Sequence, residues 1–217
     1  MNIISVTTNL EGEKRMSRPR AIFASVPPDA NGIPRWDTTS GTKPVEYSKP
    51  YQYWPDLDWA GNSLDNNDPT EYGLERPKYL WSHSLVQDPV NGESYVFIRQ
   101  WFAGQRGDAF DYQTIPADDL IVTITHAADN NYAMALIVGG IEVGTVQPPI
   151  GSNSEVPDTE LSWRNAKTYL YHLDLTQIPP GTEINLVSEV INTPQIPHGI
   201  VETNPAMFTW VMQVFNK

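Results

Sequence analysis

Residues 120–146 read LIVTITHAADNNYAMALIVGGIEVGTV, and this stretch decides the fold. Its first run, LIVTITH, alternates in polarity with a period of two, which is typical of a β-strand with two different faces. Two more β-rich runs follow, separated by the polar residues 129–131 and by Gly139-Gly140. Short polar side chains favour turns, and a glycine pair supplies the positive φ that a two-residue hairpin needs. We therefore predict a compact antiparallel meander of three strands.

The same stretch shares a pattern with a known family of β-sandwiches. Residues 128–132, followed by the glycine hairpin, resemble a hairpin of the galactose-binding-like jelly roll, which is common among carbohydrate-binding modules. That family usually has asparagine where this chain has Gly139. Residues 181–193 and 204–210 resemble the family's penultimate and closing strands. The resemblance spans about residues 79–215 and implies an all-β fold, an antiparallel jelly-roll β-sandwich of about eight strands.

The composition indicates a folded protein with a sizeable core. Of the 217 residues, 40% are hydrophobic and only 18% are charged, and 19 prolines and 14 glycines favour strands and turns over helices. A net charge of −12 argues against nucleic-acid partners and anionic membrane surfaces, because both attract clusters of Lys and Arg. With no cysteine, disulfides and thiolate metal sites are excluded.

The first third of the chain differs from the rest. Residues 1–77 hold nine of the nineteen prolines, which break up regular structure. We interpret them as an extended proline-rich arm with one or two strands, at residues 2–8 and 21–26, separated by a solvated loop at 11–20. Residues 78–217 form the sandwich. The arm docks either on its own sandwich or on a neighbouring subunit, and we favour a role in covering a second copy.

The closing strand, at residues 206–215, is apolar on both faces. A strand of this kind is buried on both sides, so the arm or a neighbouring subunit is expected to cover its outer face. The candidates for subunit contact are Ile3, Ile4, Val6, Ile22, Phe23, Tyr47, Tyr51, Tyr53, Met207, Val211 and Phe215.

Aromatic residues gather at positions 47–59. They can belong to the core of the chain, to a subunit contact, or to a platform on which sugar rings stack, and the sequence leaves all three open. The sugar-binding candidates are Trp54, Trp59, Trp101 and Trp163, with Arg106 and Asp108 as polar partners.

An acidic loop follows these aromatics. Calcium prefers oxygen ligands, which Asp56, Asp58, Asp65 and Asp68 can supply, although such clusters are also ordinary turns. A structural calcium is also what the resemblance to galactose-binding-like domains implies. We expect no other cofactor.

No pattern of catalytic residues is present in the sequence. There is no Gly-x-Ser-x-Gly elbow and no phosphate-binding loop, and the four histidines lack metal-ligand spacing. We interpret His126 and His172 as structural histidines with satisfied hydrogen bonds. We therefore expect no enzymatic activity.

These observations favour a structural or assembly protein, a jelly-roll subunit that builds a homo-oligomeric surface, filament or particle through its arm. The alternative is a carbohydrate-binding module that stacks sugars on loop aromatics, with a glycan as its ligand. Residues 1–20 contain no apolar signal segment, and no run is apolar enough to span a membrane. The location stays open, and a cell-surface, spore-surface or phage-particle position after cytoplasmic synthesis is compatible with the sequence.

Overall fold

The computed structural model describes residues 6–8, 14–16, 19–24, 36–38, 45–47, 79–81, 94–129, 131–148, 166–192 and 207–217. Within these ranges the chain forms β-strands and one 3-10 turn, η2 (Leu175–Gln177), and no helix is long and apolar enough to cross a bilayer. The strands are β1 (Val6–Thr8), β2 (Lys14–Met16), β3 (Ala21–Ala24), β4 (Trp36–Thr38), β5 (Val45–Tyr47), β6 (Tyr79–Trp81), β7 (Ser94–Phe102), β8 (Asp119–Asp129), β9 (Asn131–Val138), β10 (Ile141–Val143), β11 (Lys167–Asp174), β12 (Glu183–Ile191) and β13 (Met207–Asn216).

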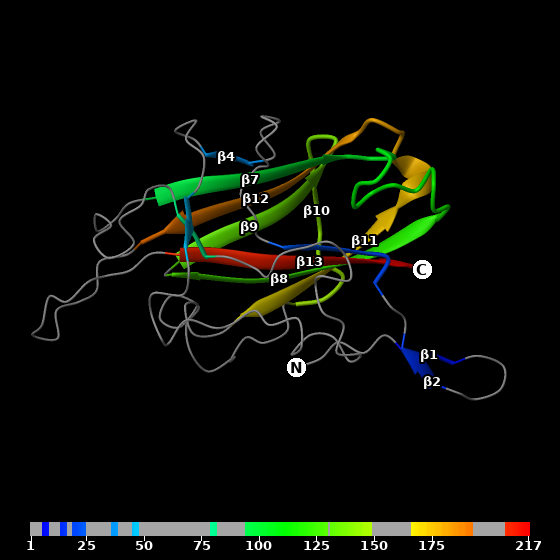
Figure 1. Ribbon diagram of the computed structural model, residues 1–217, viewed down its shortest axis with the longest axis horizontal. Coiled ribbons are helices and arrows are strands. Elements are labelled where there is room, and N and C mark those ends of the chain that lie inside the picture. The colour runs from blue at the N-terminus through cyan, green and yellow to red at the C-terminus, as the bar shows by residue number, and fades with distance from the viewer. Residues whose placement is uncertain are drawn as a thin grey trace, which may run out of the picture.

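Two antiparallel sheets form a sandwich. One has the order β10-β9-β12-β7-β4, and the other has the order β11-β8-β13-β6-β5, with β3 also paired to β13. In Figure 1, β7, β12 and β9 run side by side in one layer, and β13 and β8 lie together in the other. The strands from β6 to β13 are the eight strands expected of the sandwich. The all-β, antiparallel fold class predicted from the sequence is confirmed.

The meander predicted for residues 120–146 is wrong at its first turn. β8 pairs with β11 and β13, whereas β9 pairs with β10 and β12, so the chain crosses from one sheet to the other between β8 and β9. Both edges of β8 are occupied, which leaves no edge for β9. The second turn is a hairpin as predicted. Gly139 and Gly140 have φ of 57° and 82°, and Val138 pairs with Ile141.

Alternate residues of the central strands fill the space between the sheets. On β8, Leu120, Val122 and Ile124 are fully buried. Aromatic rings from both sheets meet around Trp101, whose ring centroid lies 6.1 Å from that of Trp210 in a T-shaped contact. Edge-to-face pairs of this kind add about 0.5–1.5 kcal/mol to the free energy of burial.

The closing strand is buried on both faces, as the sequence indicates. Phe208 and Trp210 point into the core, and Met207 and Val211, on the opposite face, are 0% and 2% exposed within the single chain. β13 pairs with β8 along its whole length, and β3 and β6 share its other edge. It is therefore an interior strand of its sheet.

The arm supplies strands to both sheets of its own chain. β3 pairs with β13, β4 with β7 and β5 with β6, while β1 and β2 form a separate hairpin. The arm thus has more strands than the one or two predicted, and residues 14–16 lie in a strand instead of a solvated loop. Phe23 packs edge-to-face on Trp101, with ring centroids 6.0 Å apart. The described strands β3, β4 and β5 thus pair with the sandwich of their own chain.

Candidate ligand-binding surface

The outward-facing residues of β7 and β12 form a polar patch beside an exposed aromatic ring. Trp101 on β7 is buried, so its strand neighbours Gln100 and Phe102 point to the outer face of the sheet. Glu183 lies directly opposite Phe102, and Asn185 lies opposite Gln100. Residues opposite each other in an antiparallel pair share a face. We call these four residues the β7–β12 patch.

The carboxylate of Glu183 is fixed by its neighbours in this patch. Its Oε1 accepts hydrogen bonds from Gln100 Nε2 at 2.6 Å and from Asn185 Nδ2 at 2.7 Å. The bonds from Asn185 and then Gln100 lower the pKa of Glu183, because they favour the charged form. Within the described part of the chain, Oε2 has no protein partner. The patch therefore presents an ionised, oriented acceptor to solvent.

Phe102 gives the patch an apolar side. Its side chain lies at the end of β7 and is 41% exposed. An exposed ring beside a few oriented polar groups is the arrangement that fixes a ligand with both an apolar and a polar side. A sugar ring is such a ligand, since its C–H face is apolar and its rim carries hydroxyl groups.

The outer face continues away from the patch as an apolar row and then a second carboxylate. Ile98, Val187 and Ala135 lie in one row across β7, β12 and β9 and are partly buried. One row further, Glu189 accepts a hydrogen bond from Ser94 Oγ at 3.0 Å. Among the described side chains of these three strands, none of the outward-facing ones is a Lys or Arg. The charged side chains described on the outer face of these three strands are therefore acidic.

The loop after β7, residues 103–118, is held in place next to the patch. The Asp111 carboxylate accepts hydrogen bonds from the backbone N–H groups of Gly107 and Thr114, at 2.8 and 2.9 Å, which lower the pKa of Asp111. Arg20, just before β3, donates to the backbone oxygen of Asp111. Ala103 exchanges backbone hydrogen bonds with the turn before β12. This end of the sandwich is thus tied together by the arm and by both sheets.

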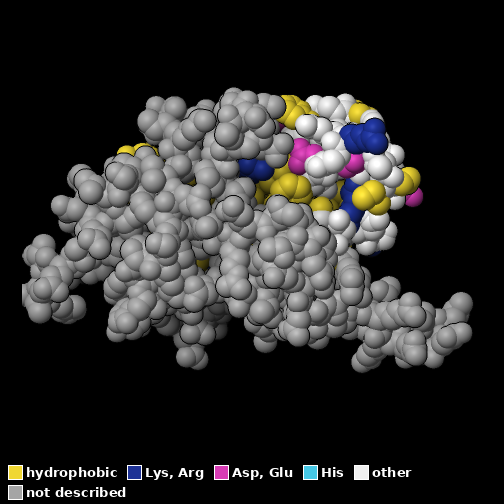
Figure 2. Space-filling view, viewed as in Figure 1, with side chains coloured by type: hydrophobic (Ala, Val, Ile, Leu, Met, Phe, Trp, Pro, Cys, Tyr) yellow, Lys and Arg dark blue, Asp and Glu magenta, His cyan; other side chains and the backbone are white. Residues whose placement is uncertain are grey.

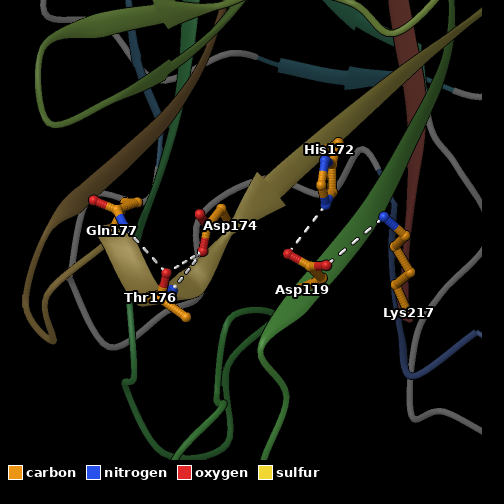
Figure 3. A network of polar contacts seen from close by, with 6 residues as sticks. All are labelled: Asp119, His172, Asp174, Thr176, Gln177 and Lys217. Atoms are coloured by element: carbon orange, nitrogen blue, oxygen red, sulfur yellow. Dashed lines mark hydrogen bonds and ion pairs between the residues drawn. The ribbon is translucent and has the colours of Figure 1, made fainter.

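A second group of polar side chains lies on the other sheet (Figure 3). Asp119, at the start of β8, lies 3.1 Å from His172 Nε2 and 3.7 Å from Lys217 Nζ. Asp174 accepts hydrogen bonds from Thr176, which lower its pKa and cap η2. These contacts join the ends of β8, β11 and β13. We interpret them as structural, in agreement with the role predicted for His172.

The core also contains a polar cluster, around His126. This side chain is 1% exposed, and neither of its ring nitrogens has a hydrogen-bond partner among the described residues. Its ring meets that of Tyr132 edge-on at 4.2 Å and stacks on Tyr169 at 5.3 Å, and the two tyrosine hydroxyls lie 3.0 Å apart. Burial, with a smaller contribution from the charge of Lys167, lowers the pKa of His126 from 6.5 to about 3. His126 is thus buried, and the prediction that its hydrogen bonds are satisfied is wrong within the described residues.

The sugar-binding residues predicted from the sequence do not form this patch. Trp101 is 1% exposed, so its ring has no face for a ligand. Arg106 is exposed in the loop after β7, and Asp108 in the same loop accepts a hydrogen bond from Ala109 N. Trp54, Trp59 and Trp163 lie outside the described residues. The alternation of β7 could have pointed to Phe102, because it places that residue opposite the buried row.

The subunit-contact candidates are spread over several strands. Met207 and Val211 are buried, and Phe23 and Phe215 are half-buried. Val6, Ile22 and Tyr47 lie in β1, β3 and β5. Ile3, Ile4, Tyr51 and Tyr53 lie outside the described residues, as do the calcium candidates Asp56, Asp58, Asp65 and Asp68. In the described ranges no three acidic or histidine side chains are grouped to hold a metal ion.

The described surface shows no dominant type of side chain from the side drawn in Figure 2. Hydrophobic, basic and acidic groups are interspersed there. No protein-family model matches the chain, and no curated protein matches it either. The fold is a β-sandwich, and a fold of this kind does not by itself define a function.

Proposed function

We propose that this chain is a non-enzymatic binding protein and that the β7–β12 patch binds a saccharide. The observation that supports this most directly is the pairing of exposed Phe102 with the anchored carboxylate of Glu183. The resemblance of the sequence to the galactose-binding-like sandwich of carbohydrate-binding modules points in the same direction. The patch lies on a sheet face, whereas the sequence pointed to loop aromatics.

In the proposed complex, the C–H face of one sugar ring lies on Phe102 and its hydroxyl groups donate to Glu183 Oε2. Gln100 and Asn185 already hold the carboxylate in place, so little side-chain freedom has to be lost on binding. The neighbouring row of apolar side chains extends the contact along the sheet. Rigid strands position all of these groups, which favours defined recognition.

Replacing Phe102 with Ala is expected to weaken saccharide binding about tenfold, which corresponds to roughly 1.4 kcal/mol. The loss reflects removal of the stacking surface while the polar groups stay in place. Isothermal titration calorimetry with a panel of oligosaccharides, chosen by glycan-array screening of the parent, measures the change.

Ile141→Ala is the matched control, because Ile141 is 74% exposed on β10 and lies outside the patch. It is expected to leave affinity unchanged. Equal affinities of the parent and Phe102→Ala would contradict the proposal, as would a parent that binds no saccharide on the array.

We also propose a second function, assembly into homo-oligomers by exchange of β3 between copies. β3 closes part of the edge of β13 through a four-residue antiparallel register. The same register can be made by the arm of another copy, which is how strand exchange links subunits without a new interface. Head-to-tail exchange of this kind gives filaments or rings, which matches the assembly role inferred from the sequence.

Cysteine cross-linking separates exchange from intrachain docking. The chain has no cysteine, so Ala21→Cys with Val214→Cys introduces one defined pair at directly opposite positions. Their Cα separation in an antiparallel pair, about 4.5–5.5 Å, suits a disulfide. If β3 is exchanged, oxidation is expected to give covalent dimers and larger species on non-reducing gels. Ala21→Cys alone controls for random surface oxidation, and a product that is entirely monomeric would exclude exchange.

A further inference from the structure

We propose that the saccharide bound at the β7–β12 patch is an amino sugar with a free, positively charged amine, presented as an oligomer. This inference rests on the proposed saccharide-binding function and adds the chemical class of the ligand. Three features of the described surface support it: the anchored carboxylate, the exposed ring beside it and the sign of the charges on the sheet face.

Together, the carboxylate of Glu183 and the ring of Phe102 form a suitable site for a cation. Glu183 keeps Oε2 for a ligand while Oε1 is held by Gln100 and Asn185. An ammonium group that donates to Oε2 lies next to Phe102, the opposite member of the strand pair. An ammonium group adds the attraction between two opposite charges to the hydrogen bond with the ionised carboxylate, and a cation near an aromatic face gains further attraction. A neutral hydroxyl group gains neither the attraction between opposite charges nor the attraction of a cation to the aromatic ring.

The described outward side chains of β7, β9 and β12 disfavour anionic sugars. They include Glu183 and Glu189 and no basic residue. The chain carries a net charge of −12, which raises the local concentration of cations and lowers that of uronic or sulfated sugars. Charge therefore favours a cationic ligand both at the patch and at long range.

The spacing of the two carboxylates indicates an oligomer. Glu183 and Glu189 are six positions apart on one strand and face the same side, which at about 3.3 Å per residue separates them by roughly 20 Å. The partly buried row that contains Val187 lies between them. A single sugar cannot reach both, whereas an extended chain with repeated amines can lie along β12.

The experiment compares three oligomers of equal length, namely glucosamine, N-acetylglucosamine and unsubstituted glucose, each titrated into the full-length protein by calorimetry. The glucosamine oligomer is expected to bind at least about tenfold more tightly than the other two, which is the effect of about one charge-assisted hydrogen bond. This preference is expected to shrink as the salt concentration rises.

Two variants locate the effect. Glu183→Gln is expected to remove the preference for glucosamine while keeping weak binding of all three oligomers. Glu142→Gln removes one exposed carboxylate on β10, outside the patch, and is expected to leave the preference intact. Thermal unfolding of both variants checks that they fold.

The outcomes separate the two proposals. If all three oligomers bind equally, or if Glu142→Gln and Glu183→Gln reduce glucosamine binding to the same extent, the inference of a cationic ligand is overturned and saccharide binding stands. If none of the three binds and glycan-array screening also finds no ligand, both proposals fail.

Discussion

Acidification from pH 7 to pH 5 is expected to lower the free energy of unfolding by about 2 kcal/mol through His126 alone. In the folded protein, burial and the nearby charge of Lys167 lower the pKa of His126 from 6.5 to about 3. The unfolded chain takes up this proton near pH 6.5, whereas the folded chain does so only near pH 3. Between these values the unfolded state binds more protons, so stability falls as the pH falls. By pH 3 the loss reaches on the order of 4–5 kcal/mol.

His126→Phe isolates this effect. Phenylalanine keeps an aromatic ring between Tyr132 and Tyr169 and removes two buried nitrogens that have no hydrogen-bond partner. The variant is expected to be at least as stable as the parent at pH 7 and clearly more stable at pH 5. Urea unfolding at both pH values measures the difference. Identical pH dependence in the two proteins would show that His126 is not the group responsible.

Trp101→Ala is expected to reduce the free energy of unfolding by about 3–5 kcal/mol, the usual cost of removing a large buried aromatic side chain. Trp101 is 1% exposed and contacts Phe23 from the arm, Phe110 from the loop after β7 and Trp210 from the opposite sheet. Its removal opens a cavity where these three parts meet. Chemical unfolding followed by far-ultraviolet circular dichroism measures the loss.

The adjacent Phe102→Ala is the matched control for that change. Phe102 is 41% exposed on the other face of the same strand, and its removal is expected to change stability by no more than about 0.5 kcal/mol. The two neighbouring aromatic residues are thus expected to differ at least about sixfold in their effects on the free energy of unfolding, and only Phe102 is expected to affect ligand binding. Similar losses for both variants would mean that the outer face of β7 is not a free surface.

Local patterns in the sequence predicted the strands well and their partners less well. The period-2 alternation of residues 120–125 and the glycine pair at 139–140 each act within a few residues, and both are found as expected. The crossing between β8 and β9 was not predictable in this way. The same polar turn can connect two strands of one hairpin or two strands of different sheets. Which of the two forms depends on the strands that occupy the edges of β8, and these are β11 and β13.

The candidate site could not be predicted from local patterns for the same reason, because it depends on how distant strands pair. Glu183 and Phe102 are 81 positions apart and become neighbours only through the register of β7 and β12. Trp101 was predicted to face a ligand because exposed tryptophans bind sugars, but the structure uses it for the core and leaves the less conspicuous Phe102 outside. Residue type alone could not separate the two rings, whereas the alternation along the strand does.

The interior position of β13 has a consequence for how the protein is made. This strand, at Met207–Asn216, separates β8 from β3 and β6. Until the ribosome has delivered these residues, β3 has no partner strand in the described part of the chain, and β6 is paired only with β5. During synthesis, one edge of β8 and the apolar strand β3 therefore remain unpaired in the nascent chain. Sheet closure is then a late, long-range event, and such intermediates are prone to aggregate. Expression at low temperature or with chaperones that protect nascent chains is expected to favour soluble protein.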